Sequence, residues 1–388
     1  MKRRRFNWVL SDVIRKVLKY YLEGIARIRG QRFHCHALEG ESEYNITVNC
    51  DLTVSCNCQD YDGSGHLGDL NKATFKDVFF GPVAQRFRDE LAKGKLPIDT
   101  CTRCGDLQRL SKAKPIPKTR LPYRGMLLEN TVRCNIDCIG CDRQSAARIR
   151  TTTQMDMEKL SRMADLVHDL GIQTLCYLNL GEPFLSPNIG LELPLLRRKN
   201  PDCQIWISTN GIVLNTDAKR EAALSASHIY FSIAGIDDVM LKKYEHLGSY
   251  EKAYGNMKAL VDYRNARGLS QPLLEWKYLL FNWNDHPRTI KRAIELAKAA
   301  GVDIISFWPT HNPFYGFSYR YALGRLNHRH RKLERARVGF ASARCQYEGR
   351  RPRSESNPTR ECPSERKRSA LTPYFIGERR AQGMESRL

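Results

Sequence analysis

The sequence predicts an α/β protein built on a parallel sheet, and two observations carry this prediction. Apolar runs rich in β-branched and aromatic residues recur between residues 126 and 307, and segments with the period of amphipathic helices separate them. Repeated strand–helix units form parallel sheets that bind ligands at the carboxyl ends of their strands. The chain has 388 residues, of which 41% are hydrophobic, enough for two domains with packed cores.

The composition favours a soluble enzyme of the cytoplasm. No apolar run approaches the ~20 residues that cross a bilayer, and residues 1–8 lack the apolar stretch of a secretory signal. We therefore expect no membrane span. Thirteen cysteines, most of them at short spacings, fit metal ligation in a reducing compartment better than disulfides.

The formal net charge of +21 would ordinarily indicate nucleic acid or an anionic surface as a partner. Residues 325–388, however, hold seventeen Lys or Arg against seven Asp or Glu, so about ten of the excess charges lie in this last sixth of the chain. We expect residues 323–388 to be a basic, disordered tail, because the sequence there has no apolar period. We assign the tail no function and do not expect nucleic acid as the partner.

The elements before residue 125 are expected to form a separate, cysteine-rich part. Residues 1–30 contain an amphipathic helix at 11–29, and residues 31–110 read as a small α+β domain with short strands and a hairpin at 44–58. The proline- and lysine-rich residues 111–124 read as a linker. The domain boundary is predicted there.

Residues 125–322 are expected to form the parallel sheet and its helices. The predicted strands are 126–133, 174–180, 204–209, 229–233, 274–281 and 303–307. The predicted helices between them are 155–170, 191–198, 217–224, 238–263 with a break near Gly248, and 288–300.

Three cysteines directly after the first strand form the most informative motif. Cys134, Cys138 and Cys141 stand with three and then two residues between them. Thiolates select zinc, copper(I) or iron–sulfur clusters, and three of them supply one ligand too few for a closed four-thiolate site. One metal position would therefore stay open. Three structural thiols, or part of a zinc knuckle, are the alternatives.

This motif at the end of a first strand resembles the radical S-adenosylmethionine (SAM) superfamily. The resemblance implies a partial (β/α)6 barrel and a [4Fe–4S] cluster on Cys134, Cys138 and Cys141, whose open iron chelates SAM. It also implies reductive cleavage of SAM to a 5′-deoxyadenosyl radical, with electrons from a flavodoxin- or ferredoxin-type donor. One position departs from the family: Gly140 stands where many members carry an aromatic residue that contacts adenine.

Polar residues at the ends of the later strands extend the resemblance. Gly181-Glu182-Pro183 resembles the family's GGE-type motif, in which Glu182 would accept from the SAM ammonium. Ala234 stands where the family usually has an acid, and Trp308 could cover adenine in place of the missing aromatic residue. The resemblance assigns these residues to SAM binding: Gly181, Glu182, Pro183, Ser208, Asn210, Ser232 and Asn284. Ordinary turns would explain the same segments.

No general acid or base is identifiable. Cys176 and Cys203 read as small buried hydrophobes, and His311 reads as a loop histidine exposed to solvent.

The cysteines before the core resemble the SPASM or twitch module, which carries auxiliary iron–sulfur clusters in many radical SAM enzymes. The resemblance implies four ligands, Cys35, Cys56, Cys101 and Cys104, with Cys58 as a substitute for Cys56. Two features depart from the family: the module precedes the core, and its cysteines suffice for one cluster. A structural zinc on the same thiols stays open.

The function expected from these resemblances is hydrogen abstraction by a radical SAM enzyme from a peptide, or from a small metabolite. A tRNA-modifying radical SAM enzyme is the first alternative, although the cysteine spacing differs from that of the methylthiolating members. A non-enzymatic metal-binding module that contacts nucleic acid is the second, and the strand-end motifs disfavour it. Neither the substrate nor the oligomeric state follows from the sequence.

Overall fold

The computed structural model describes residues 2–58, 60–310, 312–323, 326 and 337–340. Its largest sheet, within the described residues, has ten strands in the order β14-β13-β12-β10-β9-β8-β6-β2-β3-β4. Six of these strands correspond to the predicted ones, and neighbours among them pair in parallel. They are β6 (Gly125–Leu128), β8 (Thr174–Cys176), β9 (Gln204–Thr209), β10 (His228–Ser232), β12 (Leu273–Leu280) and β13 (Ile304–Pro309). The predicted parallel sheet is confirmed, although β6 and β8 end four or more residues earlier than predicted.

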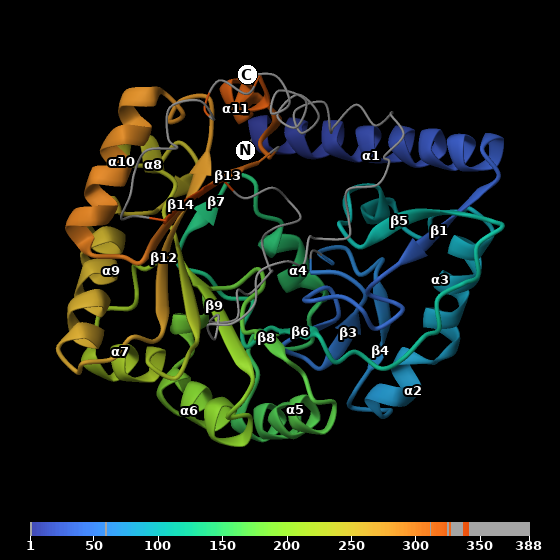
Figure 1. Cartoon of the computed structure of the whole chain (residues 1–388), viewed down its shortest axis with the longest axis horizontal. Coiled ribbons are helices and arrows are strands. Elements are labelled where there is room, and N and C mark those ends of the chain that lie inside the picture. The colour runs from blue at the N-terminus through green and yellow to red at the C-terminus, as the bar shows by residue number, and fades with distance from the viewer. Residues whose placement is uncertain (1, 59, 311, 324–325, 327–336, 341–388) are drawn as a thin grey trace, which may run out of the picture.

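Five helices of seven to sixteen residues lie along the outside of these strands (Figure 1). They are α5 (Met157–Asp169), α6 (Ile189–Lys199), α7 (Asp217–Ala223), α9 (Tyr250–Asn265) and α10 (Pro287–Ala300). Local chemistry sets their ends: the Asp156 side chain caps α5, and α10 begins at Pro287 and ends at Gly301 with φ 73°. The predicted break near Gly248 is confirmed, since α8 (Asp238–Leu241) and β11 (Glu245–His246) precede α9.

Strand side chains on the sheet face that the helices cover are buried, and those on the opposite face are partly exposed. Trp276, Tyr278, Phe231 and Phe307 are fully buried in the main core. Alternate residues of the same strands point to the other side, which we call the inner face. Short elements surround the carboxyl ends of the strands: β7 (Asp137–Cys138), α4 (Arg143–Ile149), η2 (Pro183–Leu185), η3 (Phe314–Gly316) and α11 (Tyr319–Ala322).

The N-terminal part continues the same sheet. Helix α1 (Lys2–Ile28) is followed by β1 (Gln31–Cys35), which pairs with β5 (Leu107–Ser111), and by a hairpin as predicted. Strand β2 of that hairpin pairs in parallel with β6. The other elements are β2 (Thr47–Val48), β3 (Thr53–Ser55), β4 (His66–Asp69), α2 (Phe75–Phe79), α3 (Pro82–Ala92) and η1 (Asp99–Arg103).

The contact between the two parts is close. A Cβ at Gly125 would lie 1.7 Å from the Glu43 carbonyl oxygen, so only glycine allows β6 to approach the N-terminal part this closely. The Leu127 and Glu129 amides donate to the Ile46 and Val48 carbonyls at 2.8 and 2.9 Å. Hydrogen bonding therefore crosses the predicted domain boundary, and the division into domains stays a prediction.

Part of the predicted tail forms a strand. Residues 337–340 form β14 (Arg337–Phe340), which pairs in parallel with β13 inside the segment expected to be a disordered tail. The rest of that tail, apart from residues 323 and 326, lies outside the described residues. In the described part of the chain, no helix combines the length and apolar character that crossing a membrane requires.

Candidate active site

The three-cysteine loop lies directly after β6, beyond the carboxyl ends of the strands. Strand β7 within the loop pairs with β11, so Cys138 stands opposite Glu245, and the Cys141 amide donates to the Cys138 carbonyl at 3.2 Å. Burial raises the pKa of the Cys134 thiol to about 11 and that of Cys138 well above its usual value. Charge on Glu182 raises the pKa of Cys134 further, charge on Glu245 raises that of Cys138, and charge on Cys141 raises both.

The chemistry of this donor set fits a cluster with one open position. Thiolates select zinc, copper(I) or iron–sulfur clusters. Three cysteines on one loop supply one ligand too few for a closed four-thiolate site, so they fit a [4Fe–4S] cluster in which one iron stays open.

Glu182 is 2% exposed and holds the ends of two strands together. Its carboxylate accepts from the Phe184 amide at 3.1 Å, the Thr209 hydroxyl at 2.8 Å and the Asn210 amide at 2.8 Å. Burial raises its pKa to about 7. A carboxylate has about four acceptor positions, so one remains for a further donor.

Gly181 and Asn210 allow the segments after β8 and β9 to pack against the cysteine loop. A Cβ at Gly181 would lie 1.9 Å from the Thr131 carbonyl oxygen, so the loop after β8 can pack there only with glycine. The Asn210 amide nitrogen lies 2.9 Å from Asn135 Oδ1 and 3.8 Å from Cys134 Sγ. The structure thus brings Gly181, Glu182 and Asn210 together with the cysteines, and their assignment to SAM binding stays a prediction.

The remaining predicted SAM-binding residues divide into two groups. Ser208 and Ser232 lie on neighbouring strands with their hydroxyl oxygens 3.3 Å apart, and both are partly exposed on the inner face. Pro183 is buried, and its carbonyl accepts from Asn130 at 3.2 Å. Asn284 is fully buried, and backbone groups of residues 234, 279 and 281 occupy its whole amide. This geometry favours a structural role for Asn284 over contact with ribose.

The segment after β13 covers Gly140. A Cβ at Gly140 would lie 2.7 Å from the Asn312 carbonyl oxygen, and the Asn312 side chain donates to the Gly140 carbonyl at 2.9 Å. An aromatic side chain would therefore clash where many family members carry one. Trp308, predicted to cover adenine, donates from Nε1 to Ser306 at 2.7 Å and faces the inner side of the sheet. His311 lies outside the described residues.

Glu245 is an acid beside the cysteine loop that the sequence did not reveal. Its Oε1 accepts from the Ala234 amide at 3.0 Å, and its buried Oε2 has no hydrogen-bond partner among the described residues. Burial raises its pKa to about 8. Glu245 brings a carboxylate from another element to the backbone of Ala234, the position where the sequence resemblance implied an acid. Only the long-range pairing of β11 with β7 reveals this.

The four predicted N-terminal ligands line one cavity. Cys35 ends β1, Cys56 follows β3, and Cys101 and Cys104 lie in and after η1. All four border a space of about 360 Å³, part of which is open to solvent. Burial raises the pKa of Cys101 to about 11 and raises the pKa values of the other three thiols.

The other cysteines lie away from this cavity. Cys58 packs on the inner face of the sheet instead, so Cys56 is the geometrically suitable ligand. Cys50 is buried with its Sγ 3.2 Å from the Thr152 carbonyl oxygen. Cys203 in the main core and Cys176 on the inner face are both buried, as predicted.

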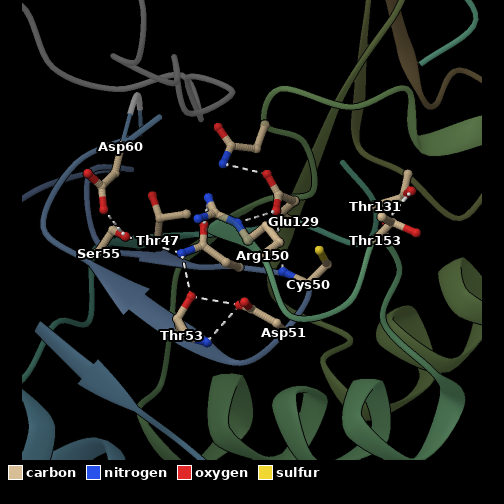
Figure 2. Close-up of polar contacts among 12 residues, drawn as sticks. Thr47, Cys50, Asp51, Thr53, Ser55, Asp60, Glu129, Thr131, Arg150 and Thr153 are labelled. Carbon is tan, nitrogen blue, oxygen red and sulfur yellow. Dashed lines mark hydrogen bonds and ion pairs between the residues drawn. The ribbon is translucent and has the colours of Figure 1, made fainter. Parts of the chain in front are cut away.

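A buried ion pair connects the N-terminal part to the start of the cysteine loop (Figure 2). Arg150 Nε lies 3.2 Å from Glu129 Oε1, and Arg150 Nη2 donates to Asn49 Oδ1 at 2.7 Å. Glu129 also accepts from Asn179 at 2.8 Å and from the Cys50 amide at 3.4 Å. Residues that directly follow β2, β6 and α4, and one from the loop after β8, therefore meet at one buried carboxylate.

Comparison with known proteins identifies the central part of the chain. Residues 128–269 match the family described as the Radical SAM superfamily. Among curated proteins, none matches the chain in sequence.

Several solved structures resemble the chain distantly. Streptococcus suis SuiB bound to S-adenosylmethionine has a TM-score of 0.45 and 14% identity, covering 70% of this chain and 60% of SuiB. SuiB bound to the precursor peptide SuiA has a TM-score of 0.42 and 14% identity over 63% of this chain and 57% of SuiB. For anSMEcpe with bound AdoMet, the TM-score is 0.35 with 15% identity over 47% of this chain and 50% of anSMEcpe. The chain thus spans 60% or less of the length of these proteins.

Proposed function

We propose, from the premise that this chain is a radical SAM superfamily enzyme, that Cys134, Cys138 and Cys141 hold its catalytic [4Fe–4S] cluster and that its substrate is a peptide. The single observation that carries the cluster assignment is the position of the cysteine loop. The loop lies beyond the carboxyl ends of the parallel strands, and Asn210 from the end of β9 reaches Cys134 Sγ at 3.8 Å. Ligands of open α/β sheets bind at this edge.

The residues around the loop have distinct proposed roles. When bound, the reduced cluster supplies the electron that cleaves SAM to methionine and a 5′-deoxyadenosyl radical. The remaining acceptor position of Glu182 suits the SAM ammonium, a charge-assisted contact, while Thr209 and Asn210 orient that carboxylate. Ser208 and Ser232 offer hydroxyls on the same edge. Asn312 covers Gly140 and limits access of water from that side.

The N-terminal cavity supports an auxiliary cluster. Four thiols from three separate segments border it. The cluster would be held by Cys35, Cys56, Cys101 and Cys104, and a structural zinc on the same thiols is the alternative. The resemblance of this cysteine set to SPASM and twitch modules is the basis for proposing a peptide; a small metabolite is the second candidate.

The proposed reaction is tested by anaerobic turnover. Reconstituted protein, dithionite and SAM are incubated, and 5′-deoxyadenosine is measured by chromatography. Wild-type protein is expected to form it, and a variant with Cys134, Cys138 and Cys141 all replaced by Ala is expected to form none. Cys203→Ala, a buried cysteine away from both cysteine sets, is the matched control. If the triple variant forms as much product as wild type, the assignment is wrong.

The alternative partner class is tested separately. A tRNA-modifying enzyme should be retained on tRNA at moderate salt after residues 341–388 are removed, because its binding would not depend on the basic tail. The peptide proposal expects no retention of that truncated protein.

A further inference from the structure

The inner face of the sheet carries an aromatic lining that is separate from the main hydrophobic core. Leu127, Cys176, Trp206 and Tyr230 form this lining, one residue from each of β6, β8, β9 and β10. Tyr230 lies edge-on to Trp206 and to Trp308, with ring centroids 6.3 and 6.2 Å apart. Such a surface suits a flat apolar group, because aromatic side chains supply most of the contact area in small-molecule sites.

Both parts of the chain contribute to this lining. Tyr44 and Cys58 from the N-terminal part pack against it together with Leu178 and Trp308. These four side chains keep partial exposure, although most of the strand residues between them are buried. The inner face is therefore accessible, and a bound group would contact the N-terminal part and the parallel strands at once.

Lys277 brings a positive charge to this face. It stands in register with Ser232 on β10, and its ammonium lies 3.9 Å from the centre of the Trp308 ring. Within the described residues the side chain makes no hydrogen bond and no ion pair. The cation–π interaction with the Trp308 ring is therefore the main contact of its ammonium group. Burial lowers the pKa of Lys277 to about 8, and the nearby Glu275 partly opposes this shift.

Glu275, the acid beside Lys277, already interacts with two other side chains. Its Oε1 accepts a hydrogen bond from Ser306, and its Oε2 lies 3.0 Å from His228 Nε2. The His228 ring stacks on Tyr230 with centroids 4.2 Å apart, and Glu275 stands in register with Tyr230, so this pair lies on the same face beside the lining. Cys58 is the other group whose charge affects Lys277. Desolvation of its partly buried thiol raises its pKa to about 12, so it stays neutral.

We propose that Lys277 binds a carboxylate of the substrate, next to an aromatic or apolar substrate group that lies against Trp206, Tyr230 and Trp308. A partly buried ammonium without a counter-ion gains a charge-assisted hydrogen bond when a carboxylate reaches it. The inference rests on the proposed function, since it places substrate on the edge where SAM would bind. A peptide carrying an aromatic residue beside its carboxyl terminus or beside an acidic side chain has this chemistry. SAM itself carries a carboxylate, so the test must separate the two sources.

The test compares two probes of equal shape on the reconstituted holoenzyme with saturating SAM and no reductant. Indole-3-propionate carries the carboxylate, and indole-3-propionamide replaces it with a neutral amide. Equilibrium dialysis measures the affinity of each probe, and separately of SAM, for wild type, Lys277→Gln, Lys277→Arg and Lys199→Gln. Lys199 pairs with Asp165 on the outer helices and is the matched control.

Wild type and Lys199→Gln are expected to bind the acid roughly tenfold more tightly than the amide, the effect of one charge-assisted hydrogen bond. Lys277→Gln should lose this preference, and Lys277→Arg should retain part of it. SAM affinity should be the same in all four proteins. The preference should also fall as pH rises through about 8, where Lys277 loses its charge while the probe stays ionised.

Three outcomes would overturn the inference. A wild type that does not prefer the acid has no carboxylate site on this face. A preference that survives in Lys277→Gln places the site elsewhere. A roughly tenfold loss of SAM affinity in Lys277→Gln would assign the lysine to the SAM carboxylate instead. None of these readouts depends on SAM cleavage, so failure of the turnover assay and failure of this inference are separate results.

Discussion

Replacing Arg150 with Met tests whether the buried ion pair at the start of the cysteine loop holds the two parts of the chain together. The Glu129 carboxylate is 0% exposed, and the Arg150 side chain is 3% exposed. In Arg150→Met, Glu129 keeps only the Asn179 amide at 2.8 Å and the Cys50 amide at 3.4 Å, and Asn49 Oδ1 loses its 2.7 Å donor. An uncompensated buried charge costs about 3–5 kcal/mol, or roughly two to three and a half orders of magnitude in the unfolding equilibrium.

The structure offers a matched control at the same boundary. Arg124 Nη2 lies 3.1 Å from Glu43 Oε1, also linking the core to the N-terminal part, but both side chains are about a third or more exposed. Arg124→Met should therefore cost less than ~1 kcal/mol. The double variant Glu129→Gln, Arg150→Met removes both buried charges and should recover much of the loss.

Equilibrium unfolding in urea, followed by circular dichroism under nitrogen on reconstituted protein, measures these differences. In Arg150→Met, the dependence of the unfolding free energy on urea concentration should be unchanged, and the urea concentration at the unfolding midpoint should fall. Similar losses for Arg150→Met and Arg124→Met would refute the reasoning, because burial would then have no effect on the cost of removing the arginine. A double variant as unstable as Arg150→Met would show that the unpaired charge of Glu129 is not the cause.

Four further predictions follow from the same structure. Replacing Cys101 and Cys104 with Ala should halve the iron content and leave the SAM-binding cluster; one stoichiometric zinc in wild type would contradict this. Glu182→Gln should weaken SAM binding roughly ten- to a hundredfold in equilibrium dialysis, through loss of a charge-assisted contact worth about 1.5–3 kcal/mol; unchanged affinity would remove Glu182 from the site. Asp303→Asn should lower stability by about 1–3 kcal/mol in urea, because its arginine partner on α9 is 4% exposed; no loss would show that the pair is dispensable. Removing residues 341–388 should leave SAM binding intact, and a truncated protein that fails to bind SAM would contradict this.

The parallel sheet could be predicted because its signals are local. Each strand and each helix has its own period, and the break near Gly248 has its own glycine. Pairing between distant segments has no such signal. The contact of β2 with β6, and of β14 with β13, depends on edges that meet only in the folded chain. The sequence therefore carries no sign that hydrogen bonds connect the two parts, and the division into domains stays a prediction.

The candidate site likewise contains residues with a local sequence signal and residues without one. The cysteine loop, Glu182 and Asn210 could be found because each belongs to a short motif at a strand end. Glu245 could not, since its position depends on the pairing of β11 with β7. Asn284 is the reverse case, a residue that the sequence favours for the site. Its residue type suits a ligand contact, but only the structure reveals that backbone groups occupy its amide.

The pairing of β2 with β6 has a consequence for how the chain is made. Strand β2 leaves the ribosome before β6, so the edge of β6 has a partner as soon as it forms. If residues 1–124 were cut away, the remaining core would carry an open row of backbone amides and carbonyls along β6, a template for joining other chains. The N-terminal part thus covers, within the same chain, a strand edge that would otherwise be open to other chains.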